Sequence, residues 1–213
     1  MKINIGIVDD HQLFLKSLVL LIGNYSNCNI VLEALNGKDL QAKLPLAKHI
    51  PDIMLIDVNM PVMDGIATTT WMHKHYHRVK KVALSMKDDD MTIIKMIKAG
   101  CCAYLLKDIH PDEFEIAINE IATQGFYNGD LSNIDYRRTR KAEKENAPLD
   151  LSETDLEFLT YACSDMTYKE IAGSMNITER NVDYYRENLF KKFNVQSRVG
   201  LCLEAVRREL VTL

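Results

Sequence analysis

The stretch Asp52-Ile53-Met54-Leu55-Ile56-Asp57-Val58-Asn59-Met60-Pro61-Val62-Met63-Asp64-Gly65 decides the fold. Its four apolar residues at 53–56 predict a short strand that is buried on both faces, as parallel strands between helices are. Asp57 ends this strand. Because open α/β sheets build their ligand sites at the carboxyl ends of their strands, Asp57 is the first candidate for a functional residue.

The rest of residues 1–125 repeats the same pattern, in which short apolar runs alternate with segments of helical spacing. The expected strands are 3–8, 29–34, 53–56, 81–84 and 103–106, and the expected helices are 13–22, 40–47, 66–76, 91–98 and 111–122. Five strands that alternate with five helices through short connections predict an α/β fold, a flavodoxin-like doubly wound five-stranded parallel sheet.

The remaining residues differ in character from this first domain. The tract at 137–146 is charged and poor in apolar residues, which predicts a linker over 126–149. Residues 150–213 have helical periodicity in four segments and contain no strand candidate, which predicts an all-α four-helix domain. A chain of 213 residues, 47% of them hydrophobic, can bury two such cores.

Composition also narrows the cellular setting. The apolar runs are far shorter than the ~20 residues needed to cross a bilayer, so we expect no membrane association. The amino terminus has no basic region followed by a long apolar run, so no signal peptide is predicted. The five cysteines form no CxxC pair, which favours free thiols in a reducing compartment. We therefore expect a soluble cytoplasmic protein.

Polar side chains stand at or just past the ends of the predicted strands: Asp9, Asp10, Asp57, Ser85 and Lys107. If the first and third strands are neighbours, three carboxylates converge there and repel one another, so the cluster needs a cation. A site with only a few oxygen ligands from the protein suits Mg²⁺, which keeps several bound waters. A carboxylate beside a divalent cation and a lysine can attack a phosphoryl group, which makes Asp57 the expected site of an acyl phosphate.

With this pattern, residues 1–125 resemble a response-regulator receiver domain, through the acid pair Asp9-Asp10 and the DxxMPxxDG motif that begins at Asp57. The resemblance implies that Asp57 accepts phosphate from a sensor histidine kinase. It implies Mg²⁺ as the cofactor, with the ligands Asp9, Asp10, Asp57 and the main-chain carbonyl of Asn59. It also implies a phosphate-sensing switch made of Ser85, Tyr104 and Lys107.

An enzymatic alternative is a phosphatase similar to the haloacid dehalogenases, which also use a strand-end aspartate with Mg²⁺. Those enzymes require a second aspartate two residues on, and this chain has Asn59 there. We therefore expect a protein that catalyses only its own phosphorylation and dephosphorylation.

The second domain contains a helix, tight turn and helix over 168–193, with Thr178 as the natural N-cap of the second helix. This stretch resembles the LuxR-type helix-turn-helix, and the whole chain resembles response regulators of the NarL/FixJ type. The resemblance implies that the helix at 178–193 enters the major groove of double-stranded DNA. The candidate DNA-binding residues are Lys169, Thr178, Arg180, Asn181, Asp183, Tyr184, Arg186, Glu187, Lys191, Lys192 and Arg198.

The outward face of this helix is not basic, which leaves two functions open. Asp183 stands where the family usually has lysine, and Glu187 occupies a second position that is often basic. Carboxylates repel phosphates, although an acid can accept a hydrogen bond from a cytosine amino group. The first hypothesis is a transcription regulator that binds a roughly palindromic promoter site as a phosphorylation-promoted homodimer. The alternative is a phosphorylation-switched protein-binding regulator whose helical domain has lost its affinity for DNA.

Overall fold

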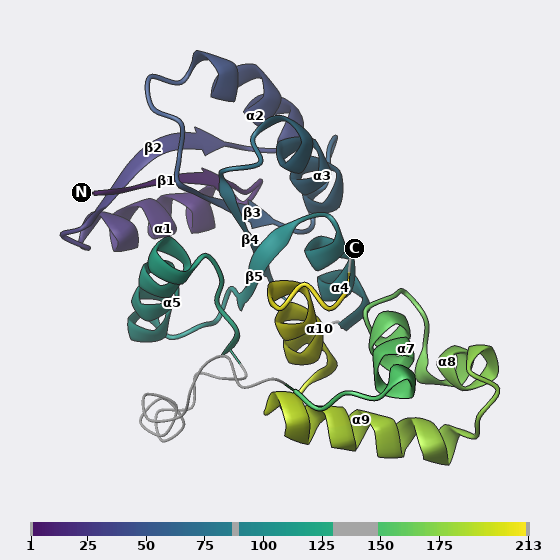
Figure 1. The fold of residues 1–213 in the computed structure, drawn as a ribbon. Coiled ribbons are helices and arrows are strands. Elements are labelled where there is room, and N and C mark those ends of the chain that lie inside the picture. Colours follow the sequence, from purple (N-terminus) through teal and green to yellow (C-terminus); the bar gives the residue numbers. More distant parts are fainter. Residues whose placement is uncertain (1, 87–89, 130–148, 212–213) are drawn as a thin grey trace. The chain divides into compact units, whose positions relative to one another are not determined.

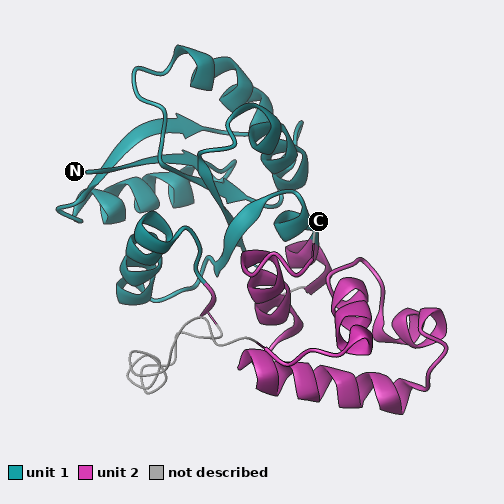
Figure 2. Cartoon of the chain, in the orientation of Figure 1, with its two compact units in different colours: residues 1–89, 95–127 teal, residues 90–94, 128–213 magenta. Residues whose placement is uncertain are grey.

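The computed structural model describes residues 2–86, 90–129 and 149–211. The chain divides into two compact units, unit 1 with residues 1–89 and 95–127 and unit 2 with residues 90–94 and 128–213 (Figure 2). Each helix in the described residues is too short or too polar to cross a membrane. The charged tract at 137–146, predicted to be part of a linker, lies outside the described residues.

Unit 1 is built on a parallel sheet whose strands lie in the order β2-β1-β3-β4-β5 (Figure 1). The strands are β1 (Ile3–Val8), β2 (Cys28–Ala34), β3 (Ile53–Asp57), β4 (Lys80–Ser85) and β5 (Cys101–Leu106). The helices are α1 (Gln12–Gly23), α2 (Gly37–Lys43), the 3-10 turn η1 (Leu44–Leu46), α3 (Gly65–His75), α4 (Asp90–Lys98) and α5 (Pro111–Gln124). This order confirms the predicted flavodoxin-like sheet, with its topological switch point between β1 and β3.

Helices cover both faces of the sheet, and each face has its own apolar core. On one face, Leu15 and Ile22 of α1 and Phe114 and Ile118 of α5 pack against the strands. A second cluster, on the opposite face, contains side chains from α2, α3 and α4, among them Met72. All five residues of β3 are buried, as the apolar run predicts for a central parallel strand.

Several boundaries differ from the sequence prediction by a few residues, among them the starts of α2 and β5. Helix α2 begins at Gly37 instead of residue 40, because the Asn36 side chain accepts a hydrogen bond from the Asp39 main-chain nitrogen at 3.0 Å and caps the helix. Strand β5 begins at Cys101, so the cysteine pair lies inside the strand. Burial raises the pKa of the Cys101 thiol to about 12, which makes it an unreactive packing residue.

Unit 2 contains the four helices that the periodicity predicts: α7 (Glu153–Ala162), α8 (Tyr168–Ser174), α9 (Glu179–Phe193) and α10 (Arg198–Arg207) (Figure 1). Each begins after a Ser or Thr whose side chain accepts a main-chain hydrogen bond: Ser152, Thr167, Thr178 and Ser197. The buried side chains include Phe158, Leu159, Ile171, Val182 and Leu189.

Candidate functional site

The carboxyl ends of β1 and β3 bring two of the predicted acids together. Val8 lies opposite Ile56 in the parallel ladder, so Asp9 and Asp57 follow at the same level of the sheet. Ser85 ends β4 and is buried, and its carbonyl accepts a hydrogen bond from the Lys107 main-chain nitrogen at 2.8 Å. Four residues that are far apart in the sequence thus meet at one edge.

Lys107 pairs with both acids inside the protein. Its Nζ lies 2.7 Å from Asp9 Oδ2 and 3.1 Å from Asp57 Oδ1. The exposed fractions of the three side chains are 3% for Lys107, 0% for Asp9 and 4% for Asp57. The same Nζ lies 4.6 Å from the centre of the Phe14 ring. A cation therefore sits permanently beside the predicted phosphoacceptor, where an incoming phosphoryl group would carry negative charge.

One lysine does not balance the acids. The pKa of Asp57 is raised from 3.8 to about 6 overall, because burial raises it, the charges of Asp9 and Asp10 add to this effect, and Lys107 opposes it. An additional cation at this edge would favour the ionised, nucleophilic form of Asp57.

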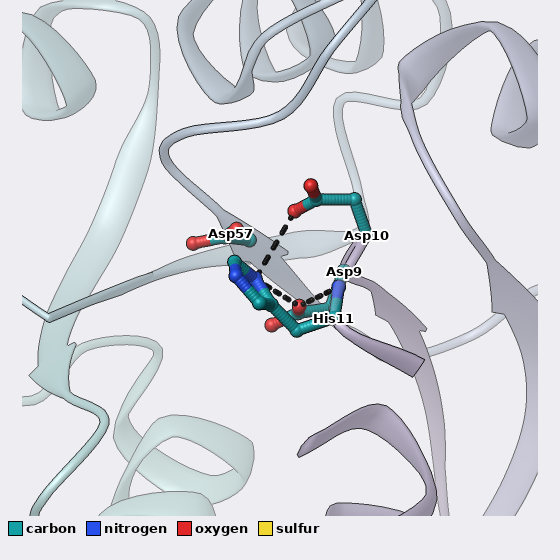
Figure 3. Close-up of side chains that lie close together, drawn as sticks. All are labelled: Asp9, Asp10, His11 and Asp57. Atoms are coloured by element: carbon teal, nitrogen blue, oxygen red, sulfur yellow. Dashed lines mark hydrogen bonds and ion pairs between the residues drawn. The ribbon is translucent and has the colours of Figure 1, made fainter. Parts of the chain in front are cut away.

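The arrangement of donor atoms fits a divalent metal ion. Ligand atoms of Asp9, Asp10, His11 and Asp57 all lie within 4.8 Å of one another (Figure 3). Among the residues that the structure describes, the partner of Asp9 Oδ2 is Lys107 Nζ, and Asp10 Oδ1 lies 3.3 Å from His11 Nδ1. Both oxygens are buried, and neither accepts a hydrogen bond from any described residue. Carboxylate oxygens are ligands that Mg²⁺ prefers.

His11 belongs to this cluster and was not predicted. Its main-chain nitrogen donates to Asp9 Oδ1 at 2.8 Å, while its side chain is 67% exposed. The signal in the sequence was its position directly after the acid pair, but an exposed histidine at a helix start is common without a function.

The Asp-Gly step at the end of the motif fixes the loop that follows Asp57. Asp64 caps α3 by accepting a hydrogen bond from the Ala67 main-chain nitrogen at 2.8 Å. A Cβ on Gly65 would lie 2.4 Å from the Asp57 carbonyl oxygen and 2.7 Å from Val58 Cα. Only glycine lets the start of α3 approach the end of β3 this closely.

Two further candidates of this site lie at its border. Asn59 is exposed on the loop two residues after Asp57. Tyr104 is partly buried in β5 and packs against the core cluster that contains Met72. The metal-binding role of the Asn59 carbonyl and the switching role of Tyr104 stay predictions.

Helix α9 in unit 2 presents the second set of candidates. Val182, Leu189 and Phe193 are buried, so they form the face of the helix that packs on the rest of unit 2. Thr178 caps the helix by accepting a hydrogen bond from the Asn181 main-chain nitrogen at 3.3 Å, as predicted. The candidates exposed on or beside α9 are Thr178, Arg180, Asn181, Asp183, Tyr184, Glu187 and Lys191, and Lys169 is exposed on α8.

Three of the positively charged DNA-binding candidates, Arg186, Lys192 and Arg198, interact with groups within unit 2. Arg198 is 5% exposed, and its Nε donates to the Ala162 carbonyl at 2.7 Å and its Nη2 to the Ser164 carbonyl at 2.9 Å. This placement corrects the prediction for Arg198, because its guanidinium joins α10 to the end of α7 instead of facing solvent.

Lys192 and Arg186 also interact with groups within unit 2, but they are less buried than Arg198. Lys192 Nζ donates to Asp155 Oδ2 at 2.8 Å and to the Asp150 carbonyl at 2.7 Å. Arg186 lies 3.1 Å from Asp183 and 5.4 Å from the centre of the Tyr168 ring. Fewer cations are therefore available to DNA phosphates than the sequence indicates.

Comparison with known proteins gives two family matches. Residues 5–119 match the response regulator receiver domain, and residues 149–205 match the luxR family of bacterial regulatory proteins. The chain is 27% identical to the transcriptional regulatory protein DegU of Brevibacillus brevis, over 97% of this chain and 94% of that protein. It is 29% identical to a nitrate/nitrite response regulator protein homolog of Haemophilus influenzae, over 93% of this chain and 94% of that protein.

Solved structures agree on the fold. RcsB of Salmonella enterica serovar Typhimurium, solved bound to promoter rprA, is 20% identical with a TM-score of 0.54, covering 96% of this chain and all of that one. A LuxR-family response regulator from Aurantimonas is 22% identical with a TM-score of 0.56, covering 67% of this chain and all of that one. The strand-end acids, the helix-turn-helix and the two family matches together show that the chain belongs to the response regulators of the NarL/FixJ type.

Proposed function

We propose that Asp57 is the phosphoacceptor of this response regulator and takes its phosphoryl group from a sensor histidine kinase. The observation that carries this proposal is the buried group of Asp9, Asp57 and Lys107 at the switch point of the sheet. Lys107 Nζ engages Asp57 Oδ1, so we assign the attack on phosphorus to Oδ2. The phosphorus-nitrogen bond of a phosphohistidine breaks as the new phosphorus-oxygen bond forms, and the kinase imidazole leaves.

Mg²⁺ would be held by Asp9, Asp10, Asp57 and the main-chain carbonyl of Asn59. When bound, it supplies positive charge that neutralises the phosphoryl oxygens. The buried oxygens of Asp9 and Asp10 that accept no hydrogen bond from described residues support this assignment. Lys107 contributes the second positive charge, and the Ser85 hydroxyl and Tyr104 are proposed to respond to the new phosphoryl group.

We further propose that phosphorylation promotes a homodimer that binds a roughly palindromic promoter site and regulates transcription in the cytoplasm. Helix α9 follows α8 in the helix-turn-helix and presents an exposed polar face, as a major-groove helix does. Two half-sites are needed because a single small module with few phosphate contacts binds weakly.

The proposed domain limits are 1–125 for the receiver domain, 126–149 for the linker and 150–213 for the helix-turn-helix domain, and the two family matches support them.

A second function has its own support in the structure. Asp183 and Glu187 place negative charge on the exposed face of α9, while Arg186, Lys192 and Arg198 are engaged within the domain. A regulator that binds another protein through this face would need no surplus of cations.

Selection of DNA from a random pool separates the two functions. The full-length protein is incubated with Mg²⁺ and beryllium fluoride, a mimic of the acyl phosphate, with Asp57→Asn as the control. Recovery of a palindromic motif only from the activated wild-type sample supports the phosphorylation-gated DNA-binding function. If activation changes the oligomeric state and no sequence is enriched even at low salt, the protein-binding function is favoured.

A further inference from the structure

The exposed face of α9 carries an acid between two cations. At about 100° per residue, Arg180, Tyr184, Glu187 and Lys191 fall within a narrow stripe opposite the buried residues of the same helix. All four side chains are exposed, and Tyr184 is 66% exposed. This stripe is the part of α9 that can reach furthest into a groove.

The two acids near this stripe are in different states. Asp183 lies to one side of the stripe and forms an ion pair with Arg186 at 3.1 Å. Glu187 lies on the stripe, and its carboxylate makes no hydrogen bond or ion pair with any residue that the structure describes, including Lys191 one turn later. Glu187 is therefore available to a ligand, whereas Asp183 already has a partner.

A free carboxylate on a DNA-reading helix has a defined chemical preference. It repels the phosphates and lowers affinity for DNA in general, but it accepts hydrogen bonds. In the major groove, the exocyclic amino groups of cytosine and adenine donate, and adenine also presents the N7 acceptor, which a carboxylate does not complement. Cytosine is thus the base that a glutamate at this position complements best.

On the basis of the proposed DNA-binding function, we infer that Glu187 is a specificity residue that selects a cytosine in each half-site by accepting a hydrogen bond from its N4 amino group. Arg180 and Lys191 flank it on the stripe at distances of two turns and one turn, and they offset its charge against the nearest phosphates. With Glu187 in this role, α9 binds DNA of any sequence less tightly but discriminates better between sequences.

The test compares sites selected by the activated full-length protein with sites selected by Glu187→Gln, which keeps the shape and removes the charge. Glutamine prefers adenine, because it can donate to N7 and accept from N6. We expect one position of each half-site to change from cytosine to adenine, with a loss of discrimination against other bases at that position of roughly tenfold to a hundredfold. Glu157→Gln, which removes an exposed acid from α7, should leave the motif unchanged.

The outcomes separate this inference from the proposed function. If the wild-type protein enriches no motif, the DNA-binding function itself fails. If Glu187→Gln binds every sequence more tightly and selects the same motif, Glu187 only repels phosphates and the inference is wrong. An unchanged motif with unchanged affinity also overturns it, and far-ultraviolet circular dichroism confirms that each variant is folded.

Discussion

Replacing Asp57 by asparagine tests how much stability the buried carboxylate of the proposed phosphoacceptor costs the protein when no divalent cation is bound. The Asp57 side chain is 4% exposed, and its pKa is raised from 3.8 to about 6. The native state then binds a proton more tightly than the unfolded chain does, so between these pKa values stability falls as pH rises. A difference of about two pKa units at 1.36 kcal/mol each amounts to about 3 kcal/mol.

We therefore expect Asp57→Asn to be more stable than wild type by up to about 3 kcal/mol at about pH 7.5 with EDTA present. The advantage should shrink as pH falls from about 6 toward about 4, and it should vanish near about pH 3, where Asp57 is protonated in both states. Lys107 loses one partner in the variant but keeps Asp9, whose Oδ2 lies 2.7 Å away. The lost ion pair therefore reduces the gain in stability without removing it.

Urea unfolding with fluorescence detection measures this difference directly. The chain has a single tryptophan, Trp71 in α3, so the signal reports on unit 1. Asp108→Asn removes an exposed acid that lies next to Lys107 in sequence, and it should change stability little at either pH. With Mg²⁺ present, wild type should gain more stability than Asp57→Asn, because the variant lacks one proposed ligand.

Two results would show that burial does not penalise the charged form of Asp57. The first is that Asp57→Asn is no more stable than wild type at about pH 7.5 in EDTA. The second is that the difference in stability between the two proteins does not depend on pH.

Three further changes test local features by urea unfolding, followed by fluorescence for unit 1 and by circular dichroism for unit 2. Gly65→Ala should destabilise unit 1 by about 2 to 3 kcal/mol, because the new Cβ would clash with main-chain atoms. As a control, Gly23→Ala should be neutral or stabilising, because its Cβ would have no atom within 4 Å. Equal effects of the two changes would contradict the close approach of α3 to β3. Val62→Gly should stabilise by up to about 1 kcal/mol, because Val62 is 81% exposed with a φ of 69° that a β-branched residue rarely adopts; a loss of stability would show that this backbone is not strained. Asp155→Asn should cost about 1 to 2 kcal/mol at neutral pH, measured by circular dichroism. Burial raises the pKa of Asp155, but hydrogen bonds from Lys192 and the Ser152 main chain lower it by more, so the native-state pKa lies below the ordinary value. The stability that ionised Asp155 contributes is therefore present above the ordinary pKa and is lost as pH falls through the native-state pKa. A cost that is the same at about pH 3 as at pH 7 would exclude the ion pair as its source.

The sequence by itself determined the two folds and named Asp57, the residue proposed as the phosphoacceptor. The hydrophobic pattern is a local property of the sequence. Short apolar runs that alternate with segments of helical spacing located all five strands of the sheet. The acids at strand ends then followed from topology, because parallel strands that share a sheet end at one edge. Side-chain caps such as Thr178 were also readable, since they depend on neighbours only three residues away.

Only the tertiary structure decided which charges are free. Arg198 read as a surface cation, yet carbonyl groups more than 30 residues away take its hydrogen bonds inside unit 2. Lys192 likewise meets Asp155 of α7 through the fold, whereas the ion pair of Arg186 with Asp183 lies within α9 and follows from local helix geometry. The pKa of Asp57 depends in the same way on burial and on Lys107, which lies 50 residues further along the chain. Burial and ion pairing are set by contacts between distant segments, so the sequence names the charged groups and the fold decides which of them a ligand can reach.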